Sequence, residues 1–137
     1  MISTPVCLDE SITSPRAAAA ALRLGACSVI NIKPARVGGY LAARAVHDLC
    51  AAHGIPVWCG GMLETGVGRA ANLALAALEN FTLPGDISAT ARYYTQDITP
   101  QFVLEDGHIA VPAGPGTGVE VLPDVIDRLT IHHEILR

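Results

Sequence analysis

The chain has 137 residues, half of them apolar and 16% charged, with a formal net charge of −4. This length suits one ordinary domain but is too short for a complete (β/α)8 barrel, which needs roughly 250 residues. An acidic balance without any basic run argues against nucleic acid and anionic membranes as partners, and no apolar stretch approaches the roughly 18 residues that cross a bilayer.

Three short apolar segments are predicted to form buried parallel strands. They cover residues 5–9, 28–33 and 56–59, and none shows the polar alternation of a half-exposed sheet. Pro5 and Pro56 stand at strand starts, where a missing N–H is tolerated. The spacing leaves room for one helix between neighbours, as in consecutive βα units joined by right-handed crossovers.

Two of the expected helices are predicted from their amino-acid composition. Residues 16–24 are rich in strong helix formers, with Ser14 as the N-cap and Pro15 at the first helical position. Residues 69–79 are rich in alanine and leucine and predict a helix after the third strand.

A helix after the second strand is predicted from apolar residues that recur every four positions. Its buried face is expected to carry Val37, Leu41, Ala45 and Leu49. Polar residues should then lie on or near the opposite side, namely Arg44, His47 and Asp48. The element order β-α-β-α-β-α indicates an α/β fold with a parallel sheet.

The texture changes after residue 80, where glycine and proline become frequent. Residues 102–104 and 108–111 flank Glu105-Asp106-Gly107, and an Asp-Gly pair favours the type I′ turn of a β-hairpin. Residues 124–129 predict a short helix. We therefore expect a barrel-like segment over residues 1–80 and an irregular tail with a β-hairpin over residues 81–137.

The N-terminus has no basic and apolar signal-peptide pattern, so we expect a cytoplasmic protein. The four cysteines are widely spaced without a CxxC pair, which predicts reduced thiols and argues against a structural zinc site.

Unusual polar residues stand at the predicted strand ends, where parallel α/β folds gather their functional groups. Lys33 is the only lysine of the chain and directly follows an apolar run. A partly desolvated lysine at a barrel mouth can have a depressed pKa and exchange protons near neutrality. The alternative is a surface lysine with its ammonium in water.

Asp9 and Glu10 end the first predicted strand. Adjacent strand residues point to opposite faces, so at most one of these carboxylates should point into a barrel. A single carboxylate cannot hold Mg²⁺, which prefers six oxygen ligands. The alternative interpretation is a loop, Asp9-Glu10-Ser11, that caps the next helix.

Three ordered motifs resemble a known family. The segments at 7–11 (CLDES), 31–39 (NIKPARVGG) and 56–66 (PVWCGGMLETG) are similar to the sixth, seventh and eighth barrel strands of enolase-superfamily enzymes. Within the muconate-lactonizing enzyme subgroup (mandelate racemase/muconate lactonizing enzyme type), they most resemble o-succinylbenzoate synthases that also racemise N-acylamino acids. Residues 83–86 and 111–119 also look like that family, so the resemblance covers essentially the whole chain.

This resemblance implies a fold and a set of site residues. The fold is the C-terminal part of a (β/α)7β TIM-like barrel, about its last three βα units, with a tail over residues 81–137 that packs on the barrel or on a capping domain. Asp9 would be the third carboxylate ligand of an essential Mg²⁺. Lys33 would be the second of two acid/base lysines, with Glu10 placed to pair with it. Pocket residues would be Gly61, Met62, Glu64 and Asp86.

The implied chemistry is removal of a proton α to a carboxylate, with Mg²⁺ stabilising the enediolate. The synthase, a carbon-oxygen lyase of menaquinone biosynthesis, then expels water from 2-succinyl-6-hydroxy-2,4-cyclohexadiene-1-carboxylate, whereas the racemase isomerises N-acylamino acids. In the synthase Lys33 would stabilise the intermediate as a cation, whereas in the racemase both lysines exchange protons. The family also suggests a homo-oligomer.

The region of the family that this chain resembles does not include the family's first lysine, its first two metal ligands or its capping domain. We therefore expect a fragment or truncated product that is inactive alone. The alternative is a non-catalytic remnant that acts, if at all, by associating with another chain. A nucleotide-binding βαβ module fits poorly, because no glycine fingerprint follows the first strand.

Overall fold

Three short parallel strands form the centre of the computed structural model, which describes residues 2–136. β1 (Cys7–Leu8), β2 (Val29–Ile32) and β3 (Val57–Cys59) lie in the order β1-β2-β3. The prediction of consecutive parallel strands is confirmed, although each strand is shorter than expected. No helix within residues 2–136 combines the length and apolarity needed to cross a bilayer.

Helix α1 (Pro15–Arg23) follows β1 with the predicted capping. The Ser14 hydroxyl accepts a hydrogen bond from the amide of Ala17 at 3.1 Å, and Pro15 occupies the first turn, where its missing N–H costs nothing. Gly25 follows the helix at φ 59°, a left-handed conformation in which glycine is favoured.

The helix predicted after the second strand is two helices, and its predicted buried face is only partly right, because Val37 is buried and Leu49 packs on the core whereas Leu41 and Ala45 are exposed. α2 (Pro34–Val37) ends at Gly38, whose φ of 100° stops the helix, and α3 (Tyr40–Ala52) starts anew after Gly39. Leu41 is 89% exposed. The buried side follows the spacing of a helix restarted at Tyr40 and carries Ala43, Val46, His47 and Cys50.

His47 is therefore a core residue rather than a residue of the opposite, polar side. Its Nε2 accepts a hydrogen bond from the amide of Asn80, so its Nδ1 carries the proton and donates to Asp48 at 2.8 Å. The ring also stacks on Phe81 with centroids 5.3 Å apart. His47 thus attaches the chain after the last barrel-like helix to α3.

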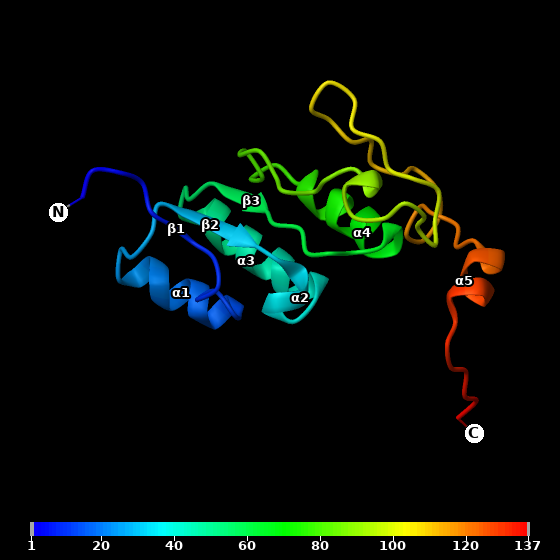
Figure 1. The fold of residues 1–137 in the computed structure, drawn as a ribbon. Coiled ribbons are helices and arrows are strands. Elements are labelled where there is room, and N and C mark those ends of the chain that lie inside the picture. The colour runs from blue at the N-terminus through cyan, green and yellow to red at the C-terminus, as the bar shows by residue number, and fades with distance from the viewer. Residues whose placement is uncertain (1, 137) are drawn as a thin grey trace.

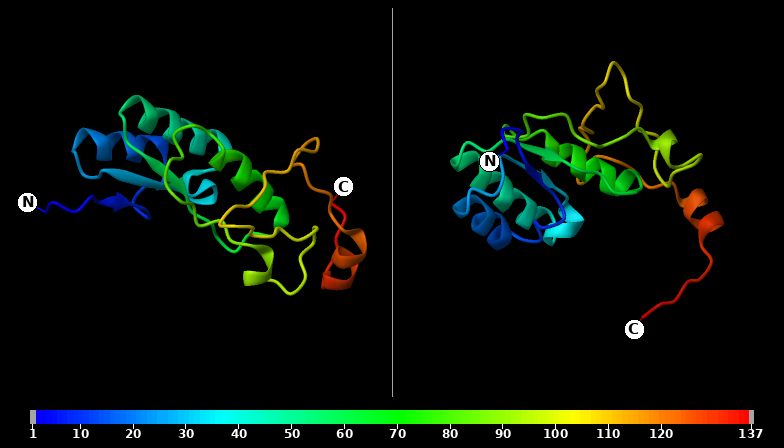
Figure 2. Two further views of the ribbon diagram at one scale, coloured as in Figure 1. Left: turned by 90° about the horizontal axis from the view of Figure 1, so that it is seen from above. Right: turned by 60° about the vertical axis from the view of Figure 1, so that its left-hand side comes forward.

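Helices α1 and α3 pack side by side on one face of the sheet (Figures 1 and 2). Because strand side chains alternate, Ile30 and Ile32 point to these helices, whereas Asn31 and Lys33 point to the other face. The main core cluster is apolar and fully buried, and its members are Ile12, Ala18, Ile30, Ile32, Val37, Ala43, Val46, Cys50, Val57, Cys59 and Leu75.

All four cysteines are free thiols, in agreement with the prediction that none forms a disulfide. Burial raises the pKa of Cys50 to about 11 and that of Cys59 to about 12. Both stay protonated near neutrality and act as small apolar core residues.

Helix α4 (Gly66–Ala76) follows β3 and begins and ends about three residues earlier than predicted. Asp97, which is almost fully buried, caps it by accepting a hydrogen bond from the amide of Gly66 at 2.8 Å. A second small core joins α4 to the tail, where Phe102 packs on Ala70 and Leu73.

The tail beyond residue 80 contains a 3-10 turn, η1 (Thr90–Arg92), and the predicted short helix, α5 (Pro123–Leu129). The predicted β-hairpin is present only as its turn. Asp106 and Gly107 both have positive φ, and Glu105 and His108 exchange two backbone hydrogen bonds of 2.8 Å. The flanking strands do not form, because the backbone N–H and C=O of Phe102 both bond to Thr90 instead.

Candidate active site

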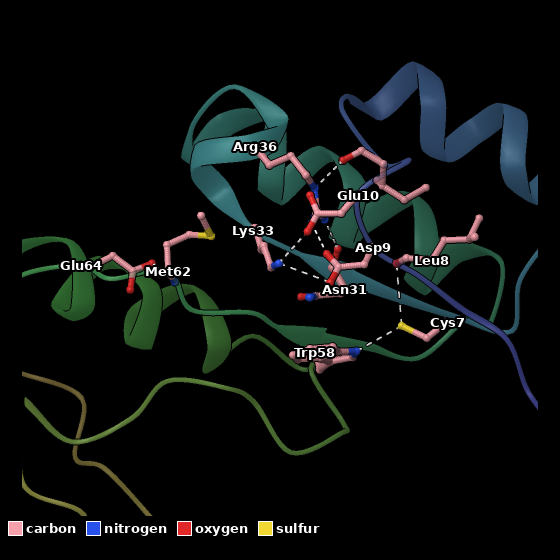
Figure 3. A network of polar contacts seen from close by, with 11 residues as sticks. Cys7, Leu8, Asp9, Glu10, Asn31, Lys33, Arg36, Trp58, Met62 and Glu64 are labelled. Atoms are coloured by element: carbon pink, nitrogen blue, oxygen red, sulfur yellow. Dashed lines mark hydrogen bonds and ion pairs between the residues drawn. The ribbon is translucent and has the colours of Figure 1, made fainter. Parts of the chain in front are cut away.

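Lys33 immediately follows β2 and extends from the sheet face that the helices leave free. Pro34 begins α2 directly after it, so the backbone around Lys33 is fixed by a strand on one side and a helix on the other. The Lys33 side chain is 16% exposed and meets carboxylates from the neighbouring β1 end (Figure 3).

Both predicted carboxylates contact the Lys33 ammonium. Nζ of Lys33 lies 2.9 Å from Oε1 of Glu10 and 3.3 Å from Oδ2 of Asp9. The expectation that only one of them could point to this side was wrong. β1 ends at Leu8, so strand alternation does not extend to Asp9 and Glu10, and a tight turn brings both round.

Arg36 is a second cation in this cluster, and sequence reasoning did not single it out. It lies on α2, one turn beyond Lys33, and its guanidinium bonds to Asp9 Oδ1 and to the backbone carbonyls of Ile12 and Asn31. It thereby ties the turn after β1 to the end of β2. The only sequence signal was its helical spacing from Lys33.

The cluster sets the charge state of both partners. Partial burial alone would raise the pKa of Asp9, but contacts from Asn31, Arg36 and Lys33 outweigh it and hold that pKa below 3.8. The hydrogen bond to Glu10 is the largest influence on Lys33 and, with Asp9, raises its pKa above 10.5 despite desolvation. The depressed pKa that a partly desolvated barrel mouth can give a lysine is not found for Lys33, because two carboxylates face its ammonium.

Asn31 lies beneath this cluster, completely buried on the same sheet face as Lys33. Its carboxamide is close to Asp9 but makes no well-formed hydrogen bond with any described residue. Gly60 of the neighbouring strand end leaves the space for it, because a Cβ there would lie 2.5 Å from Asn31 Oδ1. This contact links the ends of β2 and β3.

The loop after β3 contains three of the four predicted pocket residues. The amide of Gly61 donates to the carbonyl of Asp86 at 2.9 Å, and a Cβ at Gly61 would collide with that carbonyl. The Met62 side chain is 54% exposed and lies between Glu64 and Lys33 in Figure 3. Glu64 accepts from the amide of Met62, and the Asp86 side chain is exposed.

The structure therefore brings the predicted Asp9, Glu10 and Lys33 together at the carboxyl ends of neighbouring parallel strands. Gly61, Met62, Glu64 and Asp86 form a second group beside β3. Residues 2–136 contain no group of three or more His, Cys, Asp or Glu side chains that could hold a metal ion by themselves.

The chain as a whole matches a known family. The model of the enolase C-terminal domain-like family covers residues 1–125. The chain belongs to that family. In a solved structure of an enolase-superfamily member from Listeria innocua, 93% of this chain superposes with a TM-score of 0.89 and 47% sequence identity, over 34% of the Listeria chain.

Two curated relatives show which enzymes of known activity the chain is similar to. The chain is 67% identical over 129 residues to an N-succinylamino acid racemase of Amycolatopsis, covering 94% of this chain and 35% of the relative. It is 54% identical over 126 residues to an o-succinylbenzoate synthase of Bacillus subtilis, covering 91% and 34%. It thus matches the C-terminal part of these enzymes and spans about a third of their length.

Proposed function

We propose that this segment supplies the C-terminal part of the active site of an o-succinylbenzoate synthase/N-succinylamino acid racemase. The observation that carries the proposal is the ion cluster in which Lys33 Nζ meets Glu10 at 2.9 Å and Asp9 at 3.3 Å. A chain that merely kept the fold would have no need of a lysine 16% exposed between two carboxylates.

Members of the enolase superfamily use Mg²⁺, and Asp9 suits one ligand position of such a site. Its side chain is 37% exposed and its lowered pKa keeps it ionised, as a hard-cation ligand must be. One carboxylate does not satisfy six-coordinate Mg²⁺, so further ligands have to come from outside residues 2–136. When bound, the cation supplies positive charge that favours removal of a proton α to the substrate carboxylate.

Lys33 is proposed as an acid/base residue that approaches the substrate from this sheet. Glu10 raises its pKa, so the resting side chain is an ammonium that can stabilise negative charge or donate a proton. Arg36 and Glu10 hold the ammonium and Asp9 in fixed positions from two sides. We further propose that Gly61, Met62 and Asp86 line the pocket for a small carboxylate, either an N-succinylamino acid or 2-succinyl-6-hydroxy-2,4-cyclohexadiene-1-carboxylate.

The high identity with working enzymes favours this function over a non-catalytic remnant. A remnant would be free to lose the three side chains of the cluster, yet Asp9, Glu10 and Lys33 remain in contact. The tail's packing on a capping domain, a homo-oligomeric state and a cytoplasmic location stay predictions.

The test uses a hybrid enzyme, in which this segment replaces the matching C-terminal part of the Amycolatopsis racemase. Lys33→Ala and Lys33→Arg should each lower turnover and α-proton exchange by about 10²-fold or more. Alanine removes the acid/base group, and the guanidinium of arginine stays protonated and is larger and planar. Arg23→Ala, at an exposed position on α1, is the matched control.

The measurements are dehydration of the cyclohexadiene substrate and deuterium incorporation into N-succinylamino acids. Circular dichroism should show that each variant keeps its fold. Near-wild-type rates in Lys33→Ala would contradict the proposed acid/base role of Lys33. A wild-type hybrid without either activity would contradict the proposed function.

A further inference from the structure

The loop between β3 and α4 is held by several polar contacts to its backbone. The amide of Gly61 donates to Asp86 O, Tyr94 OH donates to Leu63 O at 2.5 Å, and Arg69 donates to Glu64 O at 3.0 Å. Arg69 is itself 1% exposed. A loop that carries two exposed apolar side chains is thus anchored through its backbone from three directions.

Glu64 contributes the fourth anchor, and its carboxylate turns inward to do so. A single oxygen, Oε1, accepts from the amide of Met62 at 2.7 Å and from Asn72 Nδ2 at 2.8 Å. Asn72 is 2% exposed and lies on α4. In Figure 3 the Glu64 carboxylate points to the Met62 backbone.

Tyr40 decides which way the Asn72 carboxamide points. Its hydroxyl, on the neighbouring helix α3, donates to Asn72 Oδ1 at 2.9 Å. With Oδ1 so engaged, Nδ2 is left to face Glu64. Burial, followed by the charge of Glu64, raises the pKa of Tyr40, so the hydroxyl remains a donor near neutrality. The chain of contacts runs from α3 through α4 to the loop.

We propose that Glu64 is a positioning residue, braced by Asn72 and Tyr40, that fixes Met62 as the apolar wall of the substrate pocket beside Lys33. This role replaces the direct substrate contact expected from the sequence. It rests on the proposed function only for its effect on substrate, since the brace itself is a property of the folded chain. Its chemistry requires an accepting oxygen at position 64 and not a negative charge.

That requirement separates the brace from a charged substrate contact. Glu64→Gln keeps an oxygen that can accept from both donors, whereas Glu64→Leu removes it. Amide hydrogen exchange at Met62, measured by NMR on the chain itself, should rise about tenfold in Glu64→Leu and stay close to wild type in Glu64→Gln. Tyr40→Phe should give a smaller rise, of about threefold, because Asn72 loses its orienting donor.

Two exposed positions give matched controls. Glu79→Leu removes a carboxylate beyond the end of α4, and Tyr93→Phe removes a hydroxyl that bonds to none of the described residues. Neither should change exchange at Met62. In the hybrid enzyme, Glu64→Leu should raise KM about tenfold with a smaller change in kcat, and Glu64→Gln should restore KM.

Unchanged Met62 exchange in Glu64→Leu would overturn the brace. A Gln variant as impaired as the Leu variant in KM would also overturn it, because a charge on Glu64 would then be what the substrate needs. An inactive wild-type hybrid would count against the proposed function, while Met62 exchange would still support or overturn the brace.

Discussion

Gly60 follows the end of β3, and Asn31 of the neighbouring β2 lies directly against it. The Asn31 carboxamide is fully buried, and neither of its polar atoms makes a well-formed hydrogen bond within residues 2–136. It occupies the space where any side chain at position 60 would begin. A buried unpaired amide is costly, so its retention against Asp9 indicates a role in the electrostatics of the ion cluster.

Gly60→Ala should therefore destabilise the chain by about 1–3 kcal/mol, because its methyl group would lie 2.5 Å from Asn31 Oδ1. In the double variant with Asn31→Ala, the clash is removed and part of that loss should be recovered. Urea unfolding of the wild type, both single variants and the double variant gives the coupling. Additive losses would show that the two residues do not share this space.

The Asp9 cluster should make stability depend on pH in acid. The pKa of Asp9 is below 3.8 in the folded chain, so its contribution is present above 3.8 and is lost as pH falls through the folded pKa. The raised pKa of Lys33 gives a contribution that is present below 10.5 and is lost only as pH rises through its folded value.

Asp9→Asn should consequently lower the urea midpoint at neutral pH, and the difference from wild type should shrink as pH falls well below 3.8. Asp127→Asn, at an exposed carboxylate, is the control that should show little change at any pH. Measurements at one protein concentration keep association constant. A difference that is the same at all pH values would contradict a stabilising charge on Asp9.

Helix α1 depends on a local start signal that the sequence displays in full. Ser14→Ala should cost about 1 kcal/mol, because the Ala17 amide loses its acceptor, whereas Ser14→Gly should cost only a few tenths. Ser11→Ala, at an exposed neighbouring hydroxyl, should be neutral. Thermal unfolding followed by circular dichroism distinguishes them, and equal losses for all three variants would argue against capping.

Such local signals explain which elements could be predicted. The three parallel strands, the Ser14 cap, α5 and the Asp106-Gly107 turn follow from residues next to one another in sequence. The buried face of α3 did not, because Gly38 and Gly39 restart the helix and shift its register relative to Val37.

Contacts between segments that are distant in sequence could not be predicted. Arg36 reaches Asp9 across 27 positions and Tyr40 reaches Asn72 across 32, and no local pattern marks either pair. The strand-end rule did place Asp9 and Lys33 in one site. It could not give the pKa of Lys33, which depends on how the turn after β1 directs Glu10.

At the scale of the whole molecule, helices cover only one face of the sheet within residues 2–136. Parallel sheets are normally buried on both faces, yet in residues 2–136 the helices α1 and α3 cover a single face and β1 pairs only with β2. Exposed apolar side chains also extend along the loop and tail, among them Leu63, Ile131, Ile135 and Leu136. An unpaired parallel edge and exposed apolar side chains both favour association with another polypeptide.

The isolated chain should therefore self-associate through the β1 edge. Sedimentation velocity in reducing buffer should show a sedimentation coefficient that rises with protein concentration.

Cys7→Lys places a charge on the edge strand, where Cys7 is exposed, and should reduce association, because a lysine at an edge opposes strand pairing. Leu41→Lys adds the same charge to an 89% exposed position on α3 and should leave association unchanged, since that position is not on the edge strand. Equal effects of the two variants would indicate that net charge, and not the edge, controls association. A sharp monomer at all concentrations with a cooperative melt would show that the open sheet is satisfied within the chain itself.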